Sequence, residues 1–160
     1  MHTDAHTGTE VFEHILSAAG PLVALETGDS AVLVDQFRLV ARRTGQAVYL
    51  WRQGEGLCSL RDAQARVPGC VRLGDALRYI LQSLHFGVYL LDMPDTVLSA
   101  TDSALLRQLA RAQTEHVRRV VLLGVNATVL GALDNVVVRI DADWRLRVIR
   151  PRLRDGRWVV

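Results

Sequence analysis

This chain contains no lysine, and all 19 of its basic side chains are arginines. Without lysine it cannot form the G-x-x-x-x-G-K-[ST] loop, in which the lysine binds the β- and γ-phosphates of a nucleotide. A GC-rich genome produces the same arginine bias, so the bias alone does not indicate phosphate binding. The net charge of +2 is unevenly spread, because residues 1–60 hold four arginines against seven acids and residues 139–160 hold seven arginines against three. The positive charge is therefore concentrated at the C-terminus.

Cysteines and long apolar runs are also scarce. The two cysteines, Cys58 and Cys70, have no C-x-x-C spacing, so we interpret them as reduced structural thiols and expect no metal site. No apolar run approaches the roughly 20 residues that span a bilayer. The N-terminal stretch MHTDAHTGTE lacks the basic and then apolar pattern of a signal peptide. We therefore expect a cytoplasmic protein that does not insert into membranes.

Common catalytic motifs are missing as well. The chain has no G-x-S-x-G, H-E-x-x-H or G-x-G-x-x-G sequence, and neither cysteine belongs to a motif with a histidine. The composition, 49% hydrophobic and 22% charged, is typical of a soluble globular protein. A length of 160 residues suits one domain with a full core. We therefore predict a single domain and expect no cofactor.

Apolar strands and amphipathic helices alternate along the chain. We expect strands at 22–26, 46–51, 88–92 and 118–124, and their nearly continuous apolar character is typical of parallel strands covered on both faces. A first helix is expected from Thr7, which has capping-box spacing to Glu10, and a second after Asp29 or Ser30. Two more are expected at 74–87, with Leu84 on the apolar face, and at 101–117. Residues 52–72 are expected to form a long connection.

This alternation predicts an α/β fold, a three-layer αβα sandwich with a mostly parallel central sheet. Residues 1–8 are expected to be a mobile tail, and residues 9–141 the α/β core. The turn-forming pair Asp155-Gly156 lies between two apolar-alternating runs, which is a hairpin signal. We therefore predict a C-terminal antiparallel β-hairpin over residues 142–160, at the edge of the sheet.

The stretch VYLLDMPDT, residues 88–96, ends a buried strand on Asp92, with Asp95 three positions later. An acid at this place in a P-loop enzyme holds Mg²⁺ or orients the attacking water. The matching phosphate loop should follow the first strand, where ALETGDSAVL has one glycine and no lysine. Glu26 and Asp29 would repel phosphate there. We therefore interpret these positions as vestigial, and the candidates are Gly28, Asp29, Ser30, Asp92, Asp95 and Asn126, the last as a turn-former or helix cap.

Taken together, the polar turn ETGDS, the strand VYLLD and the strand before GVNA resemble a degenerate P-loop NTPase core of the AAA or RecA-like kind. The chain resembles in particular the non-catalytic N-terminal domain of uncharacterised AAA ATPases found in chloroplasts and cyanobacteria. That domain also has a PLV-like strand after its first helix and an aromatic strand leading into glycine, here VYLWRQGEGL. The resemblance spans roughly residues 9–141. It implies a pseudo-NTPase without hydrolytic activity that acts as an interaction or regulatory subunit.

Two alternatives stay open at this point. The first is a nucleotide or cyclic-dinucleotide sensor that binds phosphates through arginine without hydrolysis. The second is a degenerate receiver-like signalling domain, because LLDMPD also resembles the phosphoacceptor strand of response-regulator receivers. Receivers need a pair of acids after the first strand and a lysine after the fifth, and this chain has no lysine.

The arginine-rich C-terminus is the candidate partner-binding segment. In WRLRVIR, arginines alternate with apolar residues, so a strand would place them on one face. Such arginines can dock an acidic protein or a related ATPase, or they can protect an exposed sheet edge from aggregation. Nucleic acid is the less favoured partner, and self-association is a further option. The candidates are Arg145, Arg147, Arg150, Arg152, Arg154 and Arg157.

Overall fold

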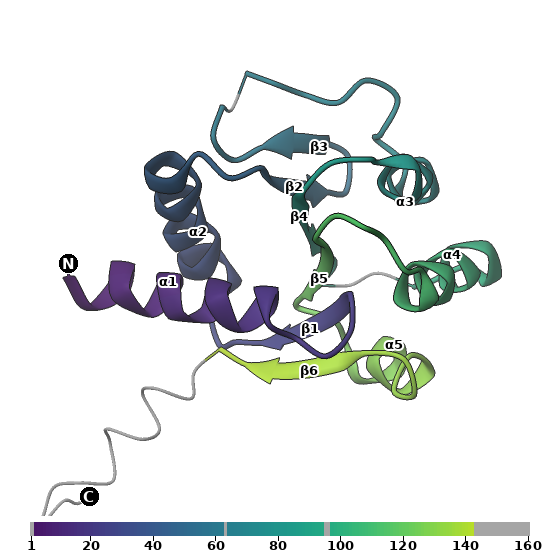
Figure 1. Cartoon of the computed structure of the whole chain (residues 1–160). Helices are drawn as coiled ribbons and strands as arrows, with labels where there is room; N and C mark the ends of the chain where they lie inside the picture. Colours follow the sequence, from purple (N-terminus) through teal and green to yellow (C-terminus); the bar gives the residue numbers. More distant parts are fainter. Residues whose placement is uncertain (1, 63, 95–96, 143–160) are drawn as a thin grey trace, which may run out of the picture.

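The structure, a computed structural model, describes residues 2–62, 64–94 and 97–142, with side chains described from residue 8 onward. Its middle layer is a six-stranded sheet in the order β3-β2-β4-β5-β1-β6 (Figure 1). All neighbouring strands pair in parallel except β2 and β3, which pair antiparallel. The strands are β1 (Leu22–Glu26), β2 (Val48–Arg52), β3 (Gly56–Ser59), β4 (Gly87–Asp92), β5 (Arg118–Leu123) and β6 (Val138–Asp141).

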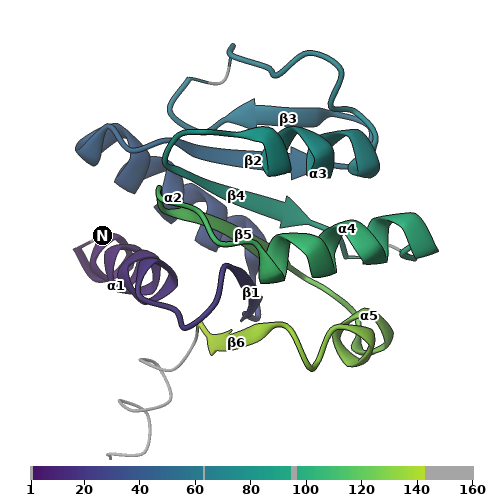
Figure 2. The same cartoon turned by 45° about the vertical axis from the view of Figure 1, so that its right-hand side comes forward.

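Helices cover both faces of the sheet, which confirms the predicted three-layer αβα class (Figures 1 and 2). On one face lie α1 (His2–Leu16) and α2 (Ser30–Thr44). On the other face lie α3 (Leu73–Gln82), α4 (Ala100–Arg111) and α5 (Ala127–Ala132). Among the described residues, no helix is both long and apolar enough to cross a membrane.

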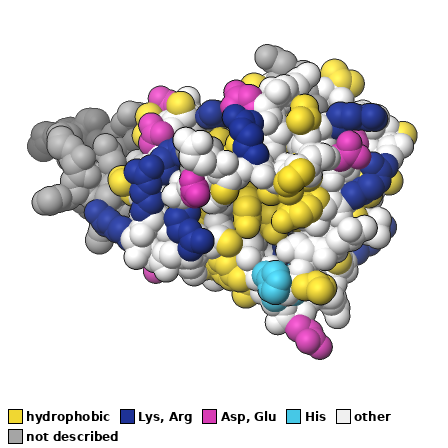
Figure 3. Space-filling model, turned by 90° about the horizontal axis from the view of Figure 1, so that it is seen from above, with side chains coloured by type: hydrophobic (Ala, Val, Ile, Leu, Met, Phe, Trp, Pro, Cys, Tyr) yellow, Lys and Arg dark blue, Asp and Glu magenta, His cyan; other side chains and the backbone are white. Residues whose placement is uncertain are grey.

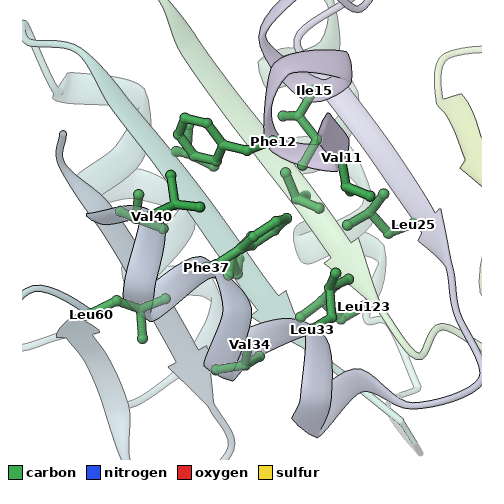
Figure 4. Packing of buried hydrophobic residues seen from close by; sticks show 14 of the residues in the cluster. Val11, Phe12, Ile15, Leu25, Leu33, Val34, Phe37, Val40, Leu60 and Leu123 are labelled. Atoms are coloured by element: carbon green, nitrogen blue, oxygen red, sulfur yellow. The ribbon is translucent and has the colours of Figure 1, made fainter. Parts of the chain in front are cut away.

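The core under α1 and α2 is built around Phe37 (Figure 4). Its ring meets the ring of Phe12 edge to face, with centroids 5.8 Å apart. Leu25 of β1 and Leu123 of β5 supply the sheet side of this core, and all four side chains are at most 2% exposed. The apolar stripe of α2, which recurs at helical spacing in the sequence, therefore faces the sheet, because residues at i, i+3 and i+4 share one side of a helix; its members are Leu33, Phe37, Val40 and Ala41.

The helix α1 begins at His2, so Thr7 lies inside it and does not start it. Gly8 explains how this end packs. A Cβ atom on Gly8 would lie 2.6 Å from Cβ of Gln36, so the absence of a side chain lets α1 approach α2 closely. Packing against α2 offsets the low helix propensity of glycine in this segment.

Two further expectations were wrong. The connection after β2 contains β3, which pairs with β2 and receives a hydrogen bond from the Val67 N–H at its outer edge. The third helix ends at Gln82 instead of reaching residue 87, and Leu84 is 78% exposed. The predicted C-terminal hairpin, at residues 142–160, lies outside the described residues apart from its first position.

The strand order also excludes the receiver-like alternative. In the receiver arrangement the first strand lies beside the second. Here β1 lies between β5 and β6, and both β4 and β5 separate it from β2. The Asp-Met-Pro sequence after β4 is therefore not part of a receiver fold.

Two consecutive arginines join the helix layers at the amino edge of the sheet. Arg118, only 3% exposed, donates from Nη1 to the carbonyls of Ile80 and Leu81 at the end of α3. Arg119 points to the opposite face and donates to the carbonyls of Ile15 and Leu16 at the end of α1. Burial lowers the pKa of both guanidinium groups, but arginine stays charged at neutral pH. Each cation therefore adds a charged donor at the negative end of a helix dipole, where the Ile80 and Ile15 carbonyls also accept the N–H groups of Ser83 and Ala18.

Candidate functional site

The candidate site lies at the carboxyl edge of the parallel strands. In open α/β sheets, ligands bind outside this edge where the connections leave a strand in opposite directions. Here that place is beside β1, because the chain crosses from β1 toward β2 and later passes from β5 to β6 on the other side. Gly124 follows β5 with φ 66°, and a Cβ atom there would lie 3.6 Å from Cα of Pro94 and 3.8 Å from Oγ of Ser30. The turns after β1, β4 and β5 therefore converge.

Asp29 forms the N-cap of α2 at the position of the expected phosphate loop. Its backbone is extended, with φ −147° and ψ 96°, and its carboxylate accepts a hydrogen bond from the Val32 N–H at 3.2 Å. Its own N–H donates to Oγ1 of Thr27, also at 3.2 Å. These contacts confirm the predicted cap. They also put a carboxylate at the helix N-terminus, where backbone N–H groups would otherwise favour phosphate.

Asp92 ends β4, and its carboxylate is paired with an arginine of the neighbouring strand. Oδ2 of Asp92 lies 3.3 Å from Nε of Arg52, and the two residues are direct partners in the β2–β4 register. The side chains are 20% and 38% exposed, respectively. The charge that would attract Mg²⁺ is thus balanced within the sheet. Asp95, the second acid of the stretch, lies outside the described residues.

Glu26 ends β1 and is paired in the same way with a strand on its other side. Its Oε2 lies 2.6 Å from Nε of Arg139 in β6, and both side chains are about half exposed. Nη1 of Arg139 is also 4.0 Å from a carboxylate oxygen of Asp134. Both acids that end central strands are therefore neutralised by arginines from adjacent strands.

Asn126 caps α5, in agreement with its interpretation as a helix cap. Its Oδ1 accepts the Val129 N–H at 2.9 Å. Five of the six vestigial candidates are described, and the side chains of Asp29, Asp92 and Asn126 make structural contacts. Within the described ranges, no three His, Cys, Asp or Glu side chains are placed to hold a metal.

Sequence reasoning missed the arginine partners and a hollow beside the edge. Arg52 directly follows the aromatic strand VYLW, but its partner is 40 residues away. The hollow, about 490 Å³, lies at the starts of α3 and α4. Trp51 lines it and donates from Nε1 to the Val71 carbonyl at 3.2 Å, while the Val71 and Val97 side chains are 54% and 89% exposed. Valines scattered among polar residues do not indicate, in a single sequence, that they will line a hollow.

Comparison with known proteins gives one family. Residues 9–142 match the family described as the N-terminal domain of SpoVK-like AAA ATPases. This range covers most of the chain and agrees with the extent of the resemblance noted from the sequence, roughly residues 9–141. No curated protein is similar enough to count as a match.

Proposed function

The chain belongs to the family of SpoVK-like AAA ATPase N-terminal domains, and from this membership we propose that it is a non-catalytic domain. Its role is that of an interaction or regulatory subunit in a bacterial cytoplasmic assembly. In this account the P-loop scaffold has been kept for its shape, and the nucleotide chemistry has been lost.

One observation carries the proposal: the acids at the carboxyl edge already have partners within the chain. Asp92 pairs with Arg52, Glu26 pairs with Arg139, and Asp29 accepts a backbone N–H of α2. Phosphoryl transfer needs a metal-binding carboxylate and a cation on the phosphates. Binding Mg²⁺ at Asp92 would break its ion pair, and phosphate at α2 would meet the Asp29 carboxylate. No lysine is available to compensate.

Measuring phosphate release from Mg²⁺-ATP and Mg²⁺-GTP tests the loss of catalysis. We expect the purified wild-type protein and Asp92→Asn to give the same rate as buffer. Turnover of about 1 per second, within the ordinary range of enzymes, would overturn the proposal if Asp92→Asn abolished it. The variant is needed because a contaminating ATPase would be unaffected by it.

The partner in this account is an acidic protein that docks on the C-terminal arginines. These residues lie outside the described part of the chain, so the support is the local charge: seven arginines against three acids in residues 139–160. Attraction between opposite charges raises the association rate of two proteins, and added salt weakens that attraction.

A partner captured from the native host allows a direct test of this surface. We expect replacement of four arginines by serine to weaken binding and to flatten its salt dependence; these are Arg145, Arg147, Arg150 and Arg152. A matched variant with four exposed arginines replaced elsewhere should bind normally; these are Arg42, Arg43, Arg78 and Arg111. If the first variant keeps the wild-type affinity and salt slope, the arginines only protect the sheet edge.

A further inference from the structure

A second, smaller hollow lies on the α2 side of the β2–β3 pair and reaches the carboxyl end of β2 at Arg52. It measures about 140 Å³ and we call it the arginine hollow, after its three guanidinium-bearing residues Arg38, Arg52 and Arg66. Leu50 and Leu60, which are 6% and 2% exposed, belong to the core beneath α2 and form its apolar part. Seen from above, arginine side chains lie toward the left, the side on which α2 lies, and also on the right (Figure 3).

The three arginines reach the hollow from three different elements. Arg38 comes from α2, Arg52 from the end of β2, and Arg66 from the segment that borders β3. Residues 28 positions apart are thus brought to one place by the β2–β3 turn and the covering helix. Several arginine side chains around one small concave surface create the positive potential that attracts a compact anion.

The charges of the hollow are incompletely balanced. Nε of Arg52 is engaged by Asp92, and Nη1 of Arg66 donates to the carbonyl of Glu55 at 2.5 Å. For Arg38, the described part of the chain provides no hydrogen bond or ion pair to its guanidinium. Glu55 is the one acid that lines the hollow, and its side chain is exposed. Three cations therefore face Glu55 and the already paired Asp92, which leaves unused N–H donors.

The volume of the hollow and the side chains that line it indicate which anion it can bind. The hollow, about 140 Å³, is smaller than the roughly 300–1,000 Å³ of pockets that enclose a drug-sized ligand, so a compact anion such as one phosphate group suits it better than a whole nucleotide. The apolar side chains on one side keep water away and strengthen the attraction between guanidinium and anion. Guanidinium N–H groups match phosphate oxygens in pairs. We propose that the arginine hollow binds a single phosphate group.

Two sources can present this group: free inorganic phosphate, or the terminal phosphate of a nucleotide whose base stays outside the hollow. In either case the binding place differs from the turn after β1, where Asp29 opposes anions. Binding in the arginine hollow therefore does not depend on the absence of catalysis at the carboxyl edge.

Calorimetric titration of the full chain with inorganic phosphate, and separately with ADP, tests the proposal, with chloride added to equal ionic strength. We expect saturable binding of at least one of the two and no matching effect of chloride. Binding of phosphate alone would identify the free ion as the source, and tighter binding of ADP would identify a nucleotide.

Two variants and one control locate the binding. Arg38→Gln and Arg66→Gln should each weaken binding about tenfold or more, since each removes charged hydrogen bonds. Arg42→Gln changes an exposed arginine of the same helix, one turn further on, and should bind as the wild type does. Glutamine keeps the helix propensity at both α2 positions. The proposal is overturned if neither ligand binds saturably, or if Arg38→Gln and Arg42→Gln weaken binding equally.

Discussion

Both edges of the sheet carry arginines, but the arginines of the two edges have different partners and different exposure. At the amino edge, Arg118 and Arg119 turn inward to opposite faces and hold the ends of α3 and α1. At the carboxyl edge, Arg52 and Arg139 stay partly exposed and pair with acids of neighbouring strands. The edge at which this kind of fold usually binds ligands is thus built from ordinary surface ion pairs, while the deepest charge interactions lie at the opposite edge.

This difference shows how burial decides the value of a charge. An exposed ion pair contributes little, because water and salt compete with it. A buried cation at the end of a helix contributes more, since its removal takes a charged donor from buried carbonyls; Ile80 and Ile15 keep the N–H groups of Ser83 and Ala18, whereas Leu81 and Leu16 lose the arginine contact. Replacing an arginine at the amino edge should therefore lower the free energy of unfolding several times more than replacing one at the carboxyl edge.

The largest effect is expected at Arg118. We expect Arg118→Met to lower the free energy of unfolding by about 3 kcal/mol, because it strips two carbonyls at the end of α3 of a charged donor. Urea unfolding measures this change. Arg111→Met, at an exposed position in the last turn of α4, is the control and should cost less than about 0.5 kcal/mol. An equal loss of unfolding free energy in the two variants would show that the Arg118 contacts stabilise the protein no more than an exposed arginine does.

An intermediate effect is expected at the start of α2. Asp29→Ala removes the N-cap and should cost about 1 kcal/mol, whereas Asp29→Ser keeps a side-chain acceptor and should restore most of the loss. Both values follow from thermal or urea unfolding at neutral pH. A serine variant as unstable as the alanine variant would argue that the carboxylate has a role other than capping.

The smallest effect is expected for the pair between β2 and β4. A double-mutant cycle with Arg52→Gln and Asp92→Asn should give a coupling energy of about 0.5 kcal/mol, falling as salt is added. A coupling energy well above 2 kcal/mol would mean that this ion pair stabilises the fold as much as the buried arginines do, which would contradict the difference between the two edges.

The sequence predicted the parts of the fold that depend on local pattern. The apolar runs at β1, β4 and β5 and the stripe containing Phe37 were recognisable because their periodicity is visible within a few residues. The strand β3 was missed, since GLCS is short, follows glycines, and becomes a strand only through pairing with β2. The early start of α1 depends on contact between Gly8 and α2, which no local pattern records.

The site was predictable in position but only partly in chemistry. Asp29 and Asn126 were identified as caps because capping involves residues three positions away. The arginine partners of Asp92 and Glu26 are 40 and 113 residues distant, and the contacts of Arg118 reach back 38. Which of many arginines meets which acid depends on strand order, and strand order was not available from the chain alone.

The most direct test of the account follows each backbone amide while nucleotide is added. In two-dimensional ¹H–¹⁵N spectra of the labelled protein, Mg²⁺-ATP should leave the amides of Gly28, Ser30 and Gly124 unmoved, because the acids of this edge are paired and the turn after β1 has no lysine to bind phosphate. Shifts confined to the surroundings of Arg38 and Arg52, including the Asp92 partner of Arg52, would agree with the arginine hollow and with the account of the carboxyl edge. Saturable shifts of the Gly28, Ser30 and Gly124 amides, lost in Asp92→Asn, would contradict the account and identify a working nucleotide site.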